Sequence, residues 1–182
     1  MPSRRKGRIL AFQALYSWEA AGSFWGMPAD PAEGPASGTV PNLFSPEPLE
    51  KPGSLGELLE FPWLETVPEA MVLDFSRLLI LGVVEKIGEV DAMIRSHLEN
   101  WDLSRLNRVD LAILRMSTYS LMYQQDIAHP SIVIAEAIGI CREYGTDESF
   151  RFVNGVLDSI RRTIKNRTRP AALEYVAGSG PG

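Results

Sequence analysis

The stretch Val109–Tyr123, VDLAILRMSTYSLMY, is apolar on most sides when it is drawn as a helix. A helix without a polar, solvent-exposed side is stable only when other elements cover it on several sides. No segment of the chain shows the alternation of apolar and polar residues that marks a half-buried strand. We therefore expect an all-α fold in which this stretch forms the central buried helix.

Two helical regions are expected before this stretch. Residues 3–21 contain no proline and carry apolar groups nearly all round, which predicts a first helix that is covered on several sides. An apolar helical stripe then runs over residues 69–98, with a weak point at Gly88. Asp102 or Ser104 is expected to cap the central helix.

Two more helices are expected after it. Pro130 stands where a first helical residue is predicted, because proline is tolerated in the first turn of a helix. Gly145 is a natural C-cap for that helix. Thr146 or Asp147 is then expected to cap a last helix that ends near Lys165. The pattern predicts about six to seven helices in total.

The region between the first helix and the stripe has a different composition. Residues 22–56 are rich in proline and glycine and show no hydrophobic period, which predicts a flexible insertion. A short helical turn is expected around Leu55–Leu59. The tail 171–182 is predicted to be disordered, so that residues 1–170 form a single domain, a size that suits one core.

Charge is divided along the chain, although the net charge is only −5. Residues 1–8 carry +4 and residues 151–182 carry +4, while the stretch 9–150 carries −13. If the fold brings both ends together, they form one positive surface that attracts polyanions. The alternative is that both ends are solvated tails.

The composition excludes several classes of protein. A single cysteine, Cys141, rules out an intramolecular disulfide framework and fits a reducing compartment. No apolar run approaches the roughly 18 residues that a membrane helix needs. Gln13 interrupts the apolar run after the basic N-terminus, which argues against a signal peptide. We expect a cytoplasmic protein with no membrane contact.

Groups for catalysis or metal binding are scarce. Cys141 falls on the apolar stripe of its helix, where a lone thiol is usually a small core residue. His97 and His129 are not at metal-ligand spacing from any other histidine or cysteine. No glycine-rich phosphate loop is present. These observations predict a protein that is not an enzyme and that uses no cofactor or metal.

The last helix carries an aromatic residue outside its apolar stripe. At about 100° per residue, Phe152 projects roughly 120° from the centre of that stripe, and Asn154 lies on the other side of it. An outward aromatic ring beside an amide and arginines suits the unpaired bases of single-stranded RNA, which stack on such rings. The alternative is that another helix, for instance the first, covers Phe152. The stripe itself consists of Phe150, Val153, Leu157, Ile160 and Ile164.

Four blocks of the chain resemble the NusB family of transcription antitermination factors. They are AFQALYSWE (11–19), WDLSRLNRVDLAILRMSTYSL (101–121), IAEAIGICREYG (134–145) and SFRFVNGVLDSI (149–160). The resemblance implies two small helical bundles packed together. It also implies binding of boxA-type single-stranded RNA of ribosomal RNA transcripts, together with a small-subunit ribosomal protein called NusE, within the RNA polymerase antitermination complex.

The resemblance also implies roles for particular residues. The arginine-rich N-terminus of the family contributes to the RNA surface, the tyrosine of ALYSW is Tyr16, and the aromatic of FVNGVLD is Phe152. An acidic residue before AILR meets the ribosomal protein in the family, and Asp110 occupies that position. The candidate RNA-binding residues are Arg4, Arg5, Lys6, Arg8, Gln13, Tyr16, Ser149, Phe152 and Asn154.

Two other functions remain open at this point. A similar domain occurs at the front of certain ribosomal RNA cytosine methyltransferases, but that enzyme would need an α/β half with a cofactor-binding glycine motif and catalytic cysteines. The other function is a helical protein-interaction module whose basic ends meet acidic partners. Some members of the family dimerise, so a homodimer is a further expectation.

Overall fold

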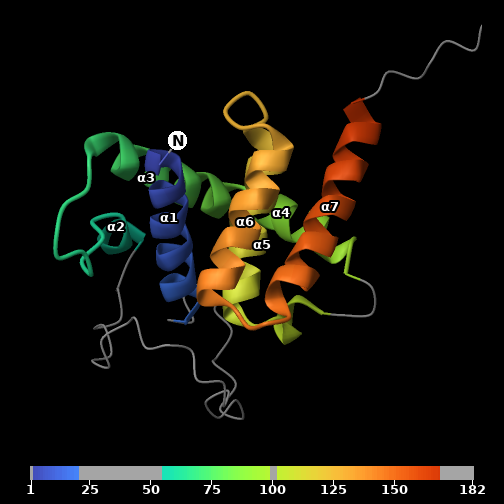
Figure 1. Cartoon of the computed structure of the whole chain (residues 1–182), viewed down its shortest axis with the longest axis horizontal. Coiled ribbons are helices and arrows are strands. Elements are labelled where there is room, and N and C mark those ends of the chain that lie inside the picture. The colour runs from blue at the N-terminus through green and yellow to red at the C-terminus, as the bar shows by residue number, and fades with distance from the viewer. Residues whose placement is uncertain (1, 21–54, 99–101, 169–182) are drawn as a thin grey trace, which may run out of the picture.

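The computed structural model describes residues 2–20, 55–98 and 102–168, and these ranges contain helices and no strand (Figure 1). The all-α class is therefore confirmed. The predicted insertion 22–56 lies, apart from its last two residues, outside the described ranges, as does the tail 171–182. The elements are α1 (Pro2–Ala20), α2 (Leu55–Leu58), α3 (Ala70–Glu85), α4 (Ile87–Arg95), the 3-10 helix η1 (Leu103–Arg105), α5 (Arg108–Tyr123), α6 (Pro130–Tyr144) and α7 (Ser149–Thr168).

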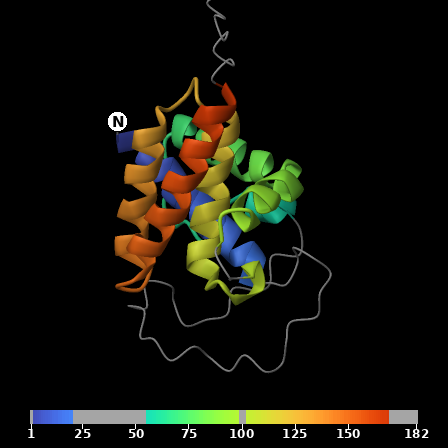
Figure 2. The ribbon, with the colours of Figure 1, turned by 90° about the vertical axis from the view of Figure 1, so that its right-hand side faces the viewer.

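The centre of the fold is α5. Its side chains are buried without interruption from Asp110 to Thr118. The helices α1, α3, α4, α6 and α7 all pack against it. In Figure 1, α6 lies in front of α5, and Figure 2 shows α7 crossing before it from the side. The prediction that the stretch Val109–Tyr123 forms the central buried helix is confirmed.

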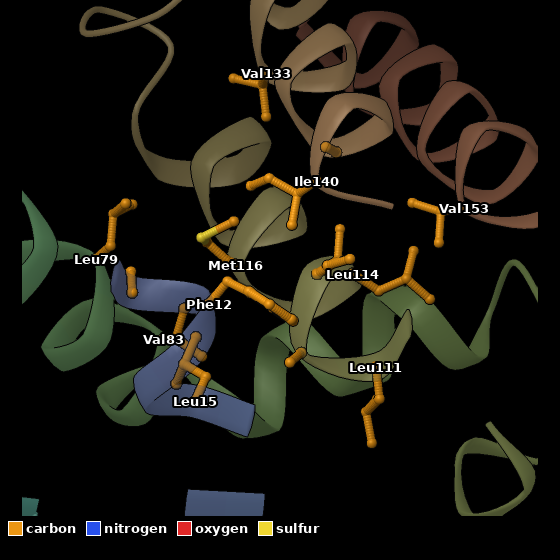
Figure 3. Packing of buried hydrophobic residues seen from close by; sticks show 14 of the residues in the cluster. Phe12, Leu15, Leu79, Val83, Leu111, Leu114, Met116, Val133, Ile140 and Val153 are labelled. Atoms are coloured by element: carbon orange, nitrogen blue, oxygen red, sulfur yellow. The ribbon is translucent and has the colours of Figure 1, made fainter. Parts of the chain in front are cut away.

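Two helical groups share α5. On one side α1 and α3 pack on each other and on α5, and on the other side α6 and α7 do the same. Figure 3 shows Met116 of α5 between Phe12 of α1 and Ile140 of α6. The buried apolar side chains of both groups form one continuous cluster. This arrangement agrees with the two packed bundles that the family resemblance implies.

The helical stripe over residues 69–98 breaks at Lys86 and not at Gly88. The Lys86 backbone has φ −103° and ψ 15°, and it is the residue at which α3 ends and α4 begins. Gly88 lies within α4, where a Cβ would meet nothing within 4 Å. The predicted break at Gly88 therefore lies two residues after the observed break at Lys86.

The cap of the central helix is also different from the prediction. The Asp102 carboxylate accepts the Ser104 N–H at 3.0 Å, but this bond caps η1. Asn107 caps α5 by accepting the Asp110 N–H at 2.7 Å. Both Asp102 and Asn107 are favoured N-cap types, so the local sequence could not separate them.

The two ends of α6 agree closely with the predictions, but α7 begins at Ser149 and directly follows Glu148, so neither Thr146 nor Asp147 is at the predicted cap position. Pro130 is the first residue of α6, and the Gly145 N–H donates to the Cys141 carbonyl at 2.8 Å where that helix ends. The short turn predicted around Leu55–Leu59 is α2, and α7 extends to Thr168, slightly beyond its predicted end.

Two general features of the described ranges bear on the site. No helix in the described ranges has the length and apolar character to cross a membrane. The histidine, cysteine and acidic side chains of the same ranges form no group of three that could hold a metal ion.

Candidate nucleic-acid interface

One side of α1 presents a strip of polar side chains. At about 100° per residue, Arg5, Lys6, Gln13 and Tyr16 fall within an arc of about 100°, opposite the fully buried Ala11. Lys6 is exposed, and the other three side chains of the strip are half-buried. Four of the predicted RNA-binding residues therefore share the outer side of α1.

Arg5 is bound by two carboxylates of α6. Its Nη1 lies 3.0 Å from Glu136 Oε2, and its Nη2 lies 3.3 Å from Glu143 Oε2. The guanidinium rests on the α6 backbone at Gly139, where an added Cβ would come within 2.6 Å of Nη1. One positive charge is thus opposed by two negative charges, so this part of the predicted RNA surface is not electropositive by itself.

The other two cations of the α1 start differ from each other. The Arg4 guanidinium is exposed and donates a hydrogen bond to the Ile127 carbonyl in the loop before α6. Lys6 is exposed and makes no hydrogen bond or ion pair with another described residue. Lys6 is therefore the cation of this segment whose charge is most available to a ligand.

Gln13 connects α1 to two aromatic residues. Its Oε1 accepts the Trp63 indole N–H at 3.3 Å, and its amide hydrogen-bonds the Tyr144 hydroxyl at the end of α6. Burial raises the pKa of Tyr144, and the neighbouring Glu143 carboxylate raises it further. The Tyr144 ring lies 5.2 Å from that of Phe12. Gln13 therefore links α1 to the end of α6 by a hydrogen bond.

Arg8 is not on the surface, which corrects its predicted place in the basic arm. Ala11, Phe12 and Leu15 follow it at helical spacings of three, four and seven residues, and all four side chains are buried. The Arg8 guanidinium lies 5.3 Å from the centre of the Phe75 ring of α3. Burial lowers the pKa of Arg8, although Glu136 opposes the shift. Arg8 thus contributes to the packing of α1 on α3.

Asp110 and Ser149 are also buried, at 5% and 2% exposed. Burial raises the pKa of Asp110, while the facing Ser149 hydroxyl and the Asn107 amide, which donates to Oδ2 at 2.7 Å, lower it. The Ser149 Oγ accepts the Thr146 N–H at 3.0 Å before the start of α7. Asp110 and Ser149 are therefore buried and hydrogen-bonded to the loops around them, and their direct contact with ligands stays a prediction.

Phe152 is half-buried and packs against the core, so of the two alternatives the structure favours the one in which the ring is covered. The fully buried side chains of α7 have their centre about 80° from Phe152 around the helix; they are Ser149, Val153, Val156, Leu157 and Ile160. Thr163 lies about 20° from Phe152 around the helix, and its hydroxyl hydrogen-bonds His97 Nε2 at 2.7 Å. Phe152 is therefore on the flank of α7 that faces the end of α4.

The two basic ends of the chain are not joined by direct packing of α1 on α7. Figure 1 shows α6 between these helices. Asn154 is exposed and lies one turn from Phe150, whose ring is approached by Arg142 of α6. Asn154 and Phe152 are thus on opposite flanks of α7, and Asn154 is on the flank nearer to α1.

The sequence reasoning missed several residues of this surface. Glu136, Gly139 and Glu143 follow one another at helical spacings on the same side of α6, and Tyr144 closes that helix. The signal was present as a pair of acids seven residues apart with a glycine between them. Only the fold shows that Arg5 is opposite this pair.

The chain was compared with known proteins. A family model described as "NusB family" matches residues 52–162. The transcription antitermination protein NusB of Treponema pallidum is 46% identical over 162 residues, which is 88% of this chain and 93% of that protein.

Solved structures agree with this match. T. maritima NusB superposes with a TM-score of 0.65 at 31% identity, over 87% of this chain and 90% of that chain. A complex of the antitermination factors NusB and NusE with dsRNA superposes with a TM-score of 0.65 over 90% of this chain and 98% of that chain. Its identity is 22%, so this likeness bears on the fold alone. On the family model, the sequence identity and the shared fold together, the chain belongs to the NusB family.

Proposed function

We propose that this protein is a cytoplasmic transcription antitermination factor that binds boxA-type single-stranded RNA of ribosomal RNA transcripts. It acts together with a small-subunit ribosomal protein, NusE, and joins the RNA polymerase antitermination complex. The observation that carries the proposal is the outer strip of α1, where the exposed Lys6 lies on the same side of the helix as Gln13 and Tyr16 in a member of the NusB family.

The chemistry of the strip suits a single strand. Phosphates need cations, and unpaired bases need aromatic faces and amide groups. Lys6 supplies an exposed cation, and Tyr16 and Gln13 supply a half-buried ring and an amide on the same side of the helix. The exposed Arg4 adds a second cation at the start of α1, outside the strip. A solved structure of the same fold is described as the antitermination factors NusB and NusE in complex with dsRNA, which supports testing RNA and NusE as partners of this chain.

The place of the ribosomal protein is proposed around the start of α5. Asp110 is buried, so it would act by fixing the exposed Asn107 and the loop that precedes α5. Asn107 donates to the Asp110 carboxylate while it accepts the Asp110 N–H, so the two residues hold one loop conformation. The ribosomal protein would then bind the surface of this loop in that conformation.

A binding titration over a salt series tests the RNA proposal. We would measure fluorescence anisotropy of labelled boxA-type RNA and of a scrambled sequence, with the full chain, alone and with the purified ribosomal protein. For single strands, log K falls with log salt with a slope of about −0.7 per phosphate neutralised. Replacing Arg4 and Lys6 by Ala should make the slope shallower by roughly 1.4, if each contacts one phosphate.

Lys86→Ala is the control, because it removes one charge at the junction of α3 and α4, outside α1. It should leave the slope unchanged. Equal affinity for boxA-type and scrambled RNA would contradict sequence recognition. An unchanged slope in the Arg4 and Lys6 variant would contradict the role of the α1 strip and would favour the protein-interaction module.

A further inference from the structure

Two arginines outside the predicted site offer charges that no described carboxylate neutralises. Arg142 at the end of α6 and Arg151 at the start of α7 are both exposed, and neither forms an ion pair within the described ranges. By contrast, Arg5 is paired with Glu136 and Glu143, and Arg8 is buried. The cations available near α6 are therefore not confined to the start of α1.

The two arginines are gathered on one aromatic ring. The Cζ atoms of Arg142 and Arg151 lie 5.1 Å and 5.5 Å from the centre of the half-buried Phe150 ring. Such distances allow cation–π attraction, which offsets part of the repulsion between two guanidinium groups that lie close together. The ring thus brings two like charges from different helices to one place on the surface.

The surroundings of the ring leave these charges open to an anion. Glu143, the carboxylate next to Arg142 in sequence, is bound to Arg5 on the other side of α6. Asp147 and Glu148 precede α7 but form no ion pair with either arginine among the described residues. Asn154 is exposed and lies one turn beyond Phe150 and Arg151, so that its amide can reach a ligand bound there.

This cluster and the α1 strip border the same helix. Arg5 meets α6 on one side, and Arg142 faces α7 on the other. Between these sides lie the exposed Ala135, with a small side chain, and Gly139, which the Arg5 guanidinium covers. Figure 1 shows α6 between α1 and α7, so a strand that crosses α6 would meet both groups.

From this geometry we propose that Arg142 and Arg151 bind phosphates of single-stranded RNA, with Asn154 contacting the adjoining base or sugar. Phe150 is a positioning residue that fixes the two guanidinium groups. The proposal rests on the proposed RNA-binding function. It places the contacts between α7 and the RNA on the side of α7 that carries Phe150. Phe152 lies on the opposite flank, toward the end of α4, and is not part of this cluster.

The test compares the double variant R142A/R151A with K86A/R95A, which removes the same charge from the region of α4. Lys86 precedes α4, and Arg95 is exposed in its last turn. With boxA-type RNA over a salt series, R142A/R151A should make the log–log slope shallower by about 1.4 and weaken binding roughly tenfold near 0.15 M salt. The control pair should change neither quantity by more than about twofold.

Two further variants separate charge from positioning. R142K/R151K keeps both charges and should keep the slope, although a lysine cannot stack as a guanidinium does. Phe150→Leu should weaken RNA binding several-fold while leaving the melting temperature within a few degrees, because Phe150 is only half-buried. Circular dichroism would confirm that each variant is folded.

The outcomes distinguish this proposal from the proposed function. If wild-type protein prefers boxA-type RNA but R142A/R151A binds with the wild-type slope and affinity, the cluster is not a phosphate site and the proposed function stands. If the control pair loses as much affinity as R142A/R151A, the effect is one of general charge and the proposal is overturned. If the wild type shows no preference for boxA-type RNA, the proposed function is contradicted, and the proposal for the arginine cluster, which rests on it, is contradicted as well.

Discussion

The Arg5 guanidinium lies on the α6 backbone at Gly139. A Cβ on that residue would come within 2.6 Å of Nη1. Glu136 and Glu143 bind the guanidinium from either side of this contact. The start of α1 is therefore attached to α6 through the Arg5 side chain, which lies over a residue without a Cβ.

Gly139→Ala should release the start of α1. The new Cβ displaces the Arg5 side chain and weakens two partly exposed ion pairs, which together contribute up to about 1 kcal/mol. Trypsin should then cleave faster after Arg4, Arg5 and Lys6. Gly88→Ala is the control, because a Cβ there meets nothing within 4 Å and both variants gain the helix propensity of alanine. Equal cleavage rates in the two variants would show that Arg5 does not hold α1.

Replacing Glu136 and Glu143 together by Gln should strengthen RNA binding. The Arg5 group then changes from a net charge of −1 to +1 beside the α1 strip. Charge effects of this kind at exposed positions are about 1 kcal/mol, so affinity for boxA-type RNA should rise roughly threefold to tenfold at low salt. A steeper salt slope should accompany the gain. Weaker binding would mean that the carboxylates organise the site instead of opposing the ligand.

Asp91→Asn should destabilise the fold strongly. Arg115 of α5, whose side chain is 4% exposed, donates to both Asp91 oxygens at 2.8 Å and 2.9 Å and also contacts Glu19 of α1. Removing one charge of such a buried pair costs about 3–5 kcal/mol. Urea unfolding monitored by circular dichroism would measure the loss.

The control for this measurement is Asp74→Asn, since the Asp74 side chain is 76% exposed and lies 3.9 Å from Arg77. Its unfolding free energy should stay within about 0.5 kcal/mol of the wild type. If Asp91→Asn behaved like Asp74→Asn, the contact between α4 and α5 would not depend on the ion pair.

The stability of the protein should depend on pH through Asp110. Its pKa in the folded state is raised above the ordinary 3.8, chiefly by burial, so the folded state binds this proton more tightly than the unfolded chain does. The contribution of Asp110 to stability is therefore greatest below pH 3.8 and is lost as the pH rises through the raised pKa. The free energy of unfolding of the wild type, measured relative to that of Asp110→Asn, should fall over this range and then level off. A difference that rises with pH would contradict the direction of the shift.

The central helix and the helix ends near Pro130 and Gly145 could be predicted because their signals are local. A helix that is apolar all round must be covered, and proline and glycine restrict the backbone where they stand. The exposure of Phe152 could not be predicted in the same way. The apolar stripe used for the prediction left out two buried residues of α7, the polar Ser149 at 2% exposed and Val156 at 6% exposed.

Most residues of the candidate site could be predicted from the sequence, but their positions relative to one another could not. The basic start of the chain was visible, and so were Gln13 and Tyr16, but Arg8 was counted as a surface charge although it lies at helical spacing from the buried Leu15. The ion pair of Arg5 with Glu136 joins residues 131 positions apart, and no local pattern reports such a contact. Three-dimensional packing decided which cations remain available.

The central claim is that one RNA strand contacts the outer side of α1 and the Arg142–Phe150–Arg151 cluster. The most direct measurement is hydrogen–deuterium exchange with mass spectrometry, on the full chain with and without boxA-type RNA. The account predicts slower exchange in α1 and across residues 142–154 when the RNA is bound, with α3 and α4 unchanged. Protection of α3 and α4, with α1 and residues 142–154 unaffected, would contradict it.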